Sequence, residues 1–151
     1  MDKHFELTNK FIINAFGVKL FQIKCTRRIK YAEVGDLGGY IEKEDNLSGD
    51  AWVSGDAQVY GNAQVYGNAR VSGDAWVSNN NEHCGFDCFG SVNRHTHAYK
   101  TQSGKVEITC GCFRGSIEEF DRQVKKTHQG NKFERQYMAI AEVIKIKFGL
   151  K

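Results

Sequence analysis

The sequence predicts a mainly β fold with an α+β C-terminal module, and its central part is expected to be a short parallel β-helix. Five nearly identical six-residue copies run without a break from Gly49 to Ser78. A β-rich stretch precedes them, and two helical patterns follow near the C-terminus. A short fixed period is typical of solenoids, whereas the loss of that period marks a second module.

The copies read GDAWVS, GDAQVY, GNAQVY, GNARVS and GDAWVS, so valine and alanine recur two residues apart. Residues two apart on a strand point to the same face, which makes these positions the predicted core. Each Gly-Asp or Gly-Asn pair supplies residues that tolerate the left-handed backbone of a sharp corner. Leu47 and Ile41 extend the valine position backwards into a less regular first part.

The segment Val53-Ser54-Gly55-Asp56-Ala57-Gln58 fits the pattern of the hexapeptide-repeat family, and residues 37–78 resemble that family. The resemblance implies a left-handed β-helix with three hexapeptides in each triangular coil. The repeat is then about two coils long, so its ends need covering.

Four large aromatic residues occupy variable positions of the repeat and are expected on its outer face. They are Trp52, Tyr60, Tyr66 and Trp76. Exposed aromatic patches indicate an interface. Because the resembling family often trimerises through such faces, we expect a homo-oligomer, with a trimer favoured over a dimer.

The runs Phe11-Ile12-Ile13 and Leu20 to Cys25 flank Asn14-Ala15-Phe16-Gly17 and predict a β-hairpin with Gly17 in its turn. We expect the hairpin to cover one end of the β-helix. Cys25 alternates with Phe21 and Ile23, which favours burial of its thiol.

After a polar linker, residues 89–100 and 105–112 predict two strands joined by a turn that ends in Gly104. Ser116 and Glu119 form a capping-box pattern at the start of one helix, and Asn131 is expected to cap a second. The predicted organisation is a β cap at 1–36, the β-helix at 37–78, a linker at 79–88 and a ββαα domain at 89–151.

The stretches FGSVNRHTHAYKT, ITCGCFRGSIEEF and VKKTH resemble an uncharacterised C-terminal domain of phage and prophage proteins, over residues 89–148. The resemblance implies no known activity. It suggests a phage accessory protein with a binding task, such as action against host defence.

Composition argues against a membrane protein, a secreted protein and a nucleic-acid-binding protein. No stretch has the roughly 20 apolar residues of a membrane-spanning helix, and no signal peptide is expected at the charged N-terminus. We therefore expect a cytoplasmic protein, in the host cell if phage-encoded, without membrane partners. The net charge is −4 over residues 37–78 and +4 over 79–151, without a dense Lys/Arg run, so nucleic acid is not an expected partner.

The odd number of cysteines, five, favours reduced thiols or metal ligands over a disulfide framework. We expect no cofactor. The alternative is a structural zinc ion held by Cys84, Cys88, Cys110 and Cys112, with His83, His95, His97 and His128 in reserve. The C-x3-C and C-x-C spacings depart from the usual paired C-x2-C, and Cys110 and Cys112 continue the apolar alternation of their strand.

The preferred function is a non-enzymatic binding protein, oligomerised by the β-helix, whose C-terminal domain binds a host protein or a small anionic ligand such as a nucleotide. The expected contacts combine cations with an aromatic ring. They are Arg94, Tyr99, Lys100, Arg114 and His128.

Two alternatives stay open. The hexapeptide resemblance suggests an acyltransferase, although residues 37–78 contain no histidine to act as the base, and His83 and His128 lie outside them. No catalytic residue is assigned. The other alternative is a structural phage component that takes no ligand.

Overall fold

The computed structural model describes residues 3–150 and divides into two compact units, one ending at Asn80 and the next beginning at Asn81. Residues 1, 2 and 151, which the expected N-terminal cap and C-terminal domain include, lie outside the described residues. Each unit is described by itself. Among the described residues, no helix has both the length and the apolar character needed to cross a membrane.

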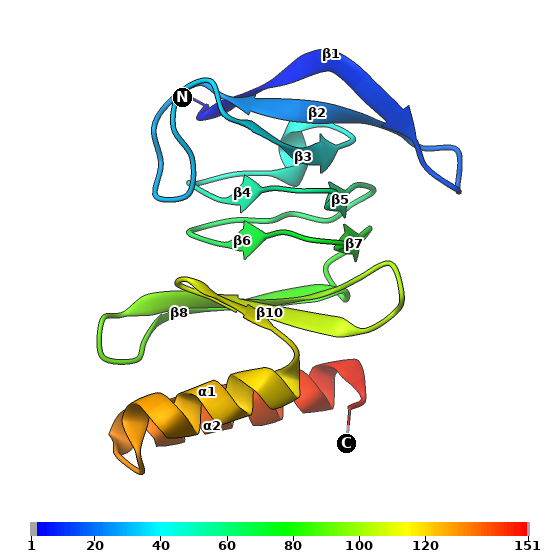
Figure 1. Cartoon of the computed structure of the whole chain (residues 1–151). Helices are drawn as coiled ribbons and strands as arrows, with labels where there is room; N and C mark the ends of the chain where they lie inside the picture. The colour runs from blue at the N-terminus through cyan, green and yellow to red at the C-terminus, as the bar shows by residue number, and fades with distance from the viewer. Residues whose placement is uncertain (1–2, 151) are drawn as a thin grey trace. The chain divides into compact units, whose positions relative to one another are not determined.

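The N-terminal hairpin forms as predicted. Strand β1 (Phe5–Ile13) pairs antiparallel with β2 (Lys19–Cys25), and Gly17 takes a positive φ of 80° in the turn. The side chain of Asn14 closes this turn, because its Oδ1 accepts hydrogen bonds from the backbone N–H groups of Phe16 and Val18. Strand β2 then pairs antiparallel with β3 (Leu37–Ile41), so the hairpin covers the repeat by extending its first sheet (Figure 1).

The repeat forms a β-solenoid in which successive layers pair in parallel. Ile41 of β3 pairs with Val59 of β5 (Gln58–Val59), and Val59 pairs with Val77 of β7 (Trp76–Val77). Each partner lies eighteen residues further along the chain, which is three hexapeptides. Figure 1 shows β3, β5 and β7 stacked one above another.

Two further rows complete the coil. Strand β4 (Trp52–Val53) pairs with β6 (Arg70–Val71), and an isolated bridge joins Leu47 to Val65. The repeated valines and alanines are all buried, as their spacing predicted. The five corner glycines have φ values of 60–64°, a conformation that glycine adopts without a Cβ penalty.

The first part of the repeat is irregular because a short 3-10 helix, η1 (Glu44–Asn46), replaces one corner. Asn46 is completely buried there, and its side-chain amide donates to the carbonyl oxygens of Gly61 and Ala63. Its Oδ1 accepts from the N–H of Lys43. One polar side chain thus ties the irregular turn to the regular coil that follows it.

The second unit contains a four-stranded antiparallel sheet in the order β11-β10-β9-β8. The strands are β8 (His83–Phe89), β9 (Arg94–Lys100), β10 (Val106–Cys110) and β11 (Phe113–Gly115). Two expectations were therefore wrong. Residues 83–88 belong to a strand and not to a linker, and the expected strand 105–112 breaks at Gly111, whose φ of 59° turns the chain back into β11.

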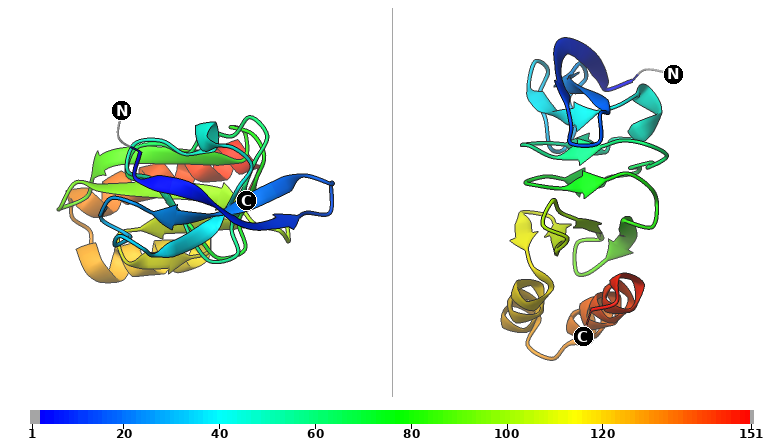
Figure 2. Two further views of the ribbon diagram at one scale, coloured as in Figure 1. Left: turned by 90° about the horizontal axis from the view of Figure 1, so that it is seen from above. Right: turned by 90° about the vertical axis from the view of Figure 1, so that its right-hand side faces the viewer.

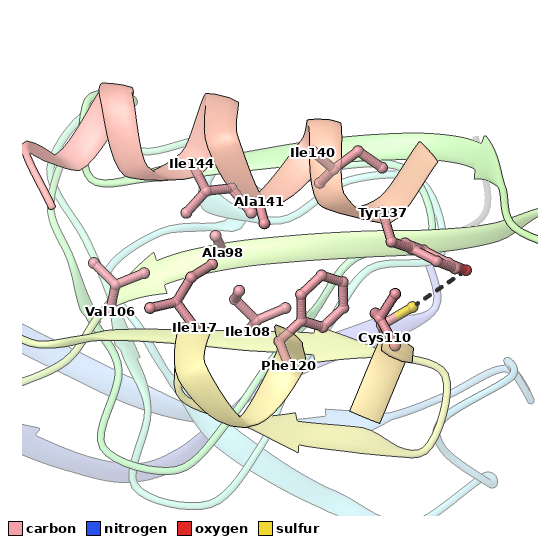
Figure 3. Close-up of a cluster of buried hydrophobic side chains, with 11 residues drawn as sticks. Ala98, Val106, Ile108, Cys110, Ile117, Phe120, Tyr137, Ile140, Ala141 and Ile144 are labelled. Atoms are coloured by element: carbon pink, nitrogen blue, oxygen red, sulfur yellow. Dashed lines mark hydrogen bonds between the residues drawn. The ribbon is translucent and has the colours of Figure 1, made fainter. Parts of the chain in front are cut away.

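Helices α1 (Ile117–His128) and α2 (Lys132–Phe148) lie on one face of this sheet (Figure 2). The predicted capping box is present, because Ser116 Oγ accepts from the N–H of Glu119 and Glu119 Oε1 accepts from the N–H of Ser116. Asn131 caps α2 through its side-chain oxygen. Figure 3 shows how apolar side chains of both helices meet those of β9 and β10 in the core of this unit.

Candidate functional site

A pocket of about 400 Å³ lies within the second unit, lined by residues of β9, β10, β11, α1 and α2 and of the turn between β8 and β9. Antiparallel alternation places Thr96, Ala98 and Cys110 on the helix-facing side of the sheet, and Arg94 continues this series at one end of β9. The pocket therefore lies between the sheet and the two helices, at the end of β9 that Arg94 begins.

Aromatic rings form one side of the pocket. Phe113 and Phe120 meet edge to face at 5.6 Å between ring centroids, and Phe120 meets Tyr137 in the same way at 5.7 Å. His128 stacks on Tyr137 at 5.6 Å with an angle of 25° between the rings. Such a wall offers flat apolar surface to a flat ligand.

The hydroxyl group of Tyr137 is held at the base of this wall. It donates to the carbonyl oxygen of Phe89 over 3.3 Å and receives a hydrogen bond from the Cys110 thiol over 3.7 Å (Figure 3). Cys110 Sγ in turn accepts from Thr96 Oγ1. Burial, with the nearby Cys110 thiol, raises the pKa of Tyr137 well above its usual value, so the phenol stays neutral.

The Arg94 guanidinium gives the pocket a positive charge without a compensating carboxylate. Arg94 and His128 line it, and none of its lining residues is Asp or Glu. Across residues 3–150, Arg94 takes part in no ion pair, whereas the Arg114 guanidinium pairs with Glu107 at 3.4 Å. The Arg94 side chain lies over Gly111, where any Cβ would overlap its guanidinium. Gly111 thus leaves the space that this arginine occupies.

The structure brings together only two of the five residues expected to contact a ligand, Arg94 and His128. Lys100 lies at the opposite end of β9, roughly 20 Å away at about 3.3 Å per residue. Tyr99 is buried on the other face of the sheet, where its hydroxyl donates to Glu107 over 2.5 Å. Arg114 also pairs with that Glu107. These three residues do not line the pocket, because they were chosen by residue type without the register of the sheet.

Three histidines lie in a row on the face of the sheet opposite the helices, and a carboxylate stands at one end of the row. We call His83, His97, His95 and Asp87 the histidine row. His83 Nδ1 lies 2.9 Å from His97 Nε2, His97 Nδ1 lies 2.9 Å from His95 Nε2, and His95 Nδ1 lies 2.5 Å from Asp87 Oδ1. Neighbouring imidazole rings stack with centroids 5.1 Å apart.

From the sequence, His95 and His97 were named as reserve zinc ligands. Both side chains are buried, as is His83. The missing signal was Gly85, which pairs with His97 across the strands. A Cβ at Gly85 would lie 2.7 Å from His97 Nδ1, so only glycine leaves room for the rings.

Burial keeps the His83 and His97 rings neutral. It lowers the pKa of His83 from 6.5 to about 4, with a further contribution from the Lys147 ammonium. Burial also lowers the pKa of His97 well below its ordinary value, and the flanking His83 and His95 add to this effect. Charge is therefore disfavoured at these two rings.

The four cysteines considered for zinc do not gather. Cys110 is buried on the helix side, Cys84 is partly buried, and Cys88 and Cys112 are exposed. Among the residues that the structure describes, no three His, Cys, Asp or Glu side chains converge as a metal site requires. The turn at Gly111, with a φ of 59°, separates Cys110 from Cys112, which the strand pattern had aligned.

The aromatic residues of the repeat do not form the exposed face that was expected. Trp52 is only 3% exposed and packs near His4, with ring centroids 6.4 Å apart. Trp76 meets Phe16 of the N-terminal hairpin edge to face, and Tyr60 is half-buried. Tyr66 remains 46% exposed. The N-terminal segment covers surfaces that the repeat alone would leave open.

Comparison with known proteins concerns the repeat. The family model described as the YdcK beta solenoid repeat matches residues 63–79, which supports a β-solenoid-like segment there. No curated protein and no solved structure matches the chain.

Proposed function

We propose that the second unit binds a small, flat, anionic ligand such as a nucleotide, and that the β-solenoid is a non-catalytic scaffold. The observation that carries the proposal is the pocket itself, in which an arginine without an ion-pair partner among residues 3–150 stands beside an aromatic wall and no carboxylate lines the space. Guanidinium groups form charge-assisted hydrogen bonds with carboxylates and phosphates, and aromatic faces stack on flat rings.

In the proposed binding mode, a cationic side chain and the aromatic rings bind different parts of the ligand. Arg94 binds the anionic group, and the ligand ring lies against Phe113 and Phe120. His128, held by stacking on Tyr137, supplies a second donor to the anion. The Tyr137 phenol is neutral at pH 7 and does not repel an anion.

For the scaffold, we propose that the repeat coils as a left-handed β-helix of about two coils, with three hexapeptides in each coil. We also propose that the chain associates with itself as a homotrimer. The eighteen-residue pairing step supports the triangular coil. Tyr66 is the exposed aromatic residue that remains for an interface. The class of the protein, a phage accessory protein that acts on host defence in the host cytoplasm, is proposed from the resemblance of residues 89–148 alone.

Calorimetric titration of the full chain with adenosine 5′-monophosphate and with adenosine tests the binding proposal. We expect the monophosphate to bind more tightly, and Arg94→Met to weaken its binding by roughly 10- to 100-fold, the range for losing a hydrogen bond between charged groups. Lys100→Met is the matched control, since it removes a cation at the far end of the same strand. Equal binding of monophosphate and nucleoside, an equal effect of both substitutions, or no binding of either compound at millimolar concentration would contradict the proposal.

A further inference from the structure

The histidine row has a fixed polarity, set by the carboxylate at its end. An ionised Asp87 can only accept, so the proton on His95 must sit on Nδ1. Neutral His95 then accepts at Nε2 from the Nδ1–H of His97, and neutral His97 accepts at Nε2 from the Nδ1–H of His83. All three neutral rings therefore carry their proton on Nδ1, and every hydrogen bond points toward Asp87.

We propose that the histidine row is a proton relay, in which a proton arriving at Nε2 of His83 produces a positive charge on His95 beside Asp87. The His83 Nδ1–H bond breaks as that proton moves to His97 Nε2, and the His97 Nδ1–H bond breaks as its proton moves to His95 Nε2. His95 ends with both nitrogens protonated. His97 and His83 end neutral, each with its proton on Nε2, so one proton has entered and one charge has appeared.

The surroundings favour charge at the Asp87 end of the row. His97 is completely buried between two other imidazoles, and burial lowers its pKa. The side chain of Asp87 is 49% exposed and offers an opposite charge at 2.5 Å from His95. A positive charge is stabilised by a nearby carboxylate and destabilised by burial, so the relay carries charge past the inner rings without leaving it there.

Other titratable groups of residues 81–151 surround the row. The Glu82 carboxylate and the Lys147 ammonium of α2 act on His83 with opposite signs. Tyr99 lies across the strands from His83, and Glu107 and Arg114 pair beside it. The Asp87 carboxylate is in hydrogen-bonding contact with the His95 ring.

Nitrogen-15 NMR of the histidine side chains in the full chain tests the relay, because the two tautomers and the doubly protonated ring have different nitrogen shifts. At high pH we expect Nδ1–H tautomers for His83, His95 and His97. His4 is an internal reference, since its Nε2 donates to the Ala51 carbonyl oxygen over 2.6 Å and must carry the proton there. On acidification, His95 should become doubly protonated while His83 and His97 switch to Nε2–H at the same midpoint.

The variant Asp87→Asn probes the end of the row, because an amide can accept or donate and carries no charge. We expect mixed tautomers at high pH and a midpoint of proton uptake lower by about one pH unit or more, the size typical of losing a close opposite charge. Asp74→Asn is the matched control; it makes the same change at an exposed repeat corner, where other copies already carry asparagine. An Nε2–H tautomer on His97 at high pH, first protonation at His83, or an unchanged midpoint in Asp87→Asn would overturn the relay.

Discussion

The side-chain amide of Asn46 donates a 2.9 Å hydrogen bond to the carbonyl oxygen of Ala63, joining the irregular first turn of the repeat to the coil after it. The same amide reaches the carbonyl oxygen of Gly61. The equivalent position of the later copies is variable and carries Gln58, Gln64 and Arg70 among others, so the buried amide is specific to the irregular first turn. The first turn is therefore held by satisfied hydrogen bonds as well as by apolar packing.

We predict that Asn46→Ala lowers the free energy of unfolding by about 3 kcal/mol, because the buried bond to the Ala63 carbonyl and the part-buried bond to the Gly61 carbonyl are lost. Each buried carbonyl group left without a donor costs about 1–3 kcal/mol. Urea unfolding followed by far-ultraviolet circular dichroism measures the change. Asn68→Ala, at an exposed corner, is the control and should stay within about 0.5 kcal/mol of the wild type. Equal stability of the two variants would show that the Asn46 bonds contribute little.

We predict that Gly85→Ala destabilises the second unit by about 2 kcal/mol. The new methyl group would lie 2.8 Å from His95 Nε2 as well as 2.7 Å from His97 Nδ1, so the rings must move apart in a buried site. Thermal unfolding measures the loss, and Ser103→Ala in the exposed turn between β9 and β10 is the control. Wild-type stability in Gly85→Ala would mean that the histidine rings are not packed against β8 as the structure shows.

The repeat could be predicted in residue detail because its period specifies both the buried positions and the corners. Val59 and Val77 can each be assigned to the core from the six-residue copy in which they lie, and the same pattern recurs in every copy. The pocket and the histidine row depend on which strands pair, and that information is not local. Arg94 and His128 lie 34 positions apart, and Gly85 has meaning only opposite His97. Residue type alone therefore selected Tyr99 and Arg114, which the sheet register places on the opposite face.

The five thiols should differ in reactivity toward iodoacetamide in the native protein. Cys88 and Cys112 are exposed and should be alkylated first, whereas Cys25 and Cys110 are buried and should be protected. Cys84 should react slowly, because burial raises the pKa of its thiol and thiolate is the reactive form. Peptide mass spectrometry over a time course gives the order, and alkylation in urea is the control. Early modification of Cys110 would contradict its place under the helices.

The folded chain should lose stability in mild acid, because the buried His83 ring resists protonation. Its pKa is about 4 in the folded chain and 6.5 when exposed, so the unfolded chain binds the extra proton between these values. The stabilising contribution is complete above pH 6.5 and is lost as the pH falls toward 4, by roughly 3 kcal/mol at about 1.4 kcal/mol per pH unit. Urea unfolding at pH 7.5, 6, 5 and 4 measures this slope. His83→Gln should flatten the slope by that amount, even if it lowers stability at pH 7.5. Ser103→Ala, which removes no titratable group, is the control and should keep the wild-type slope; equal slopes in all three proteins would place the acid sensitivity elsewhere.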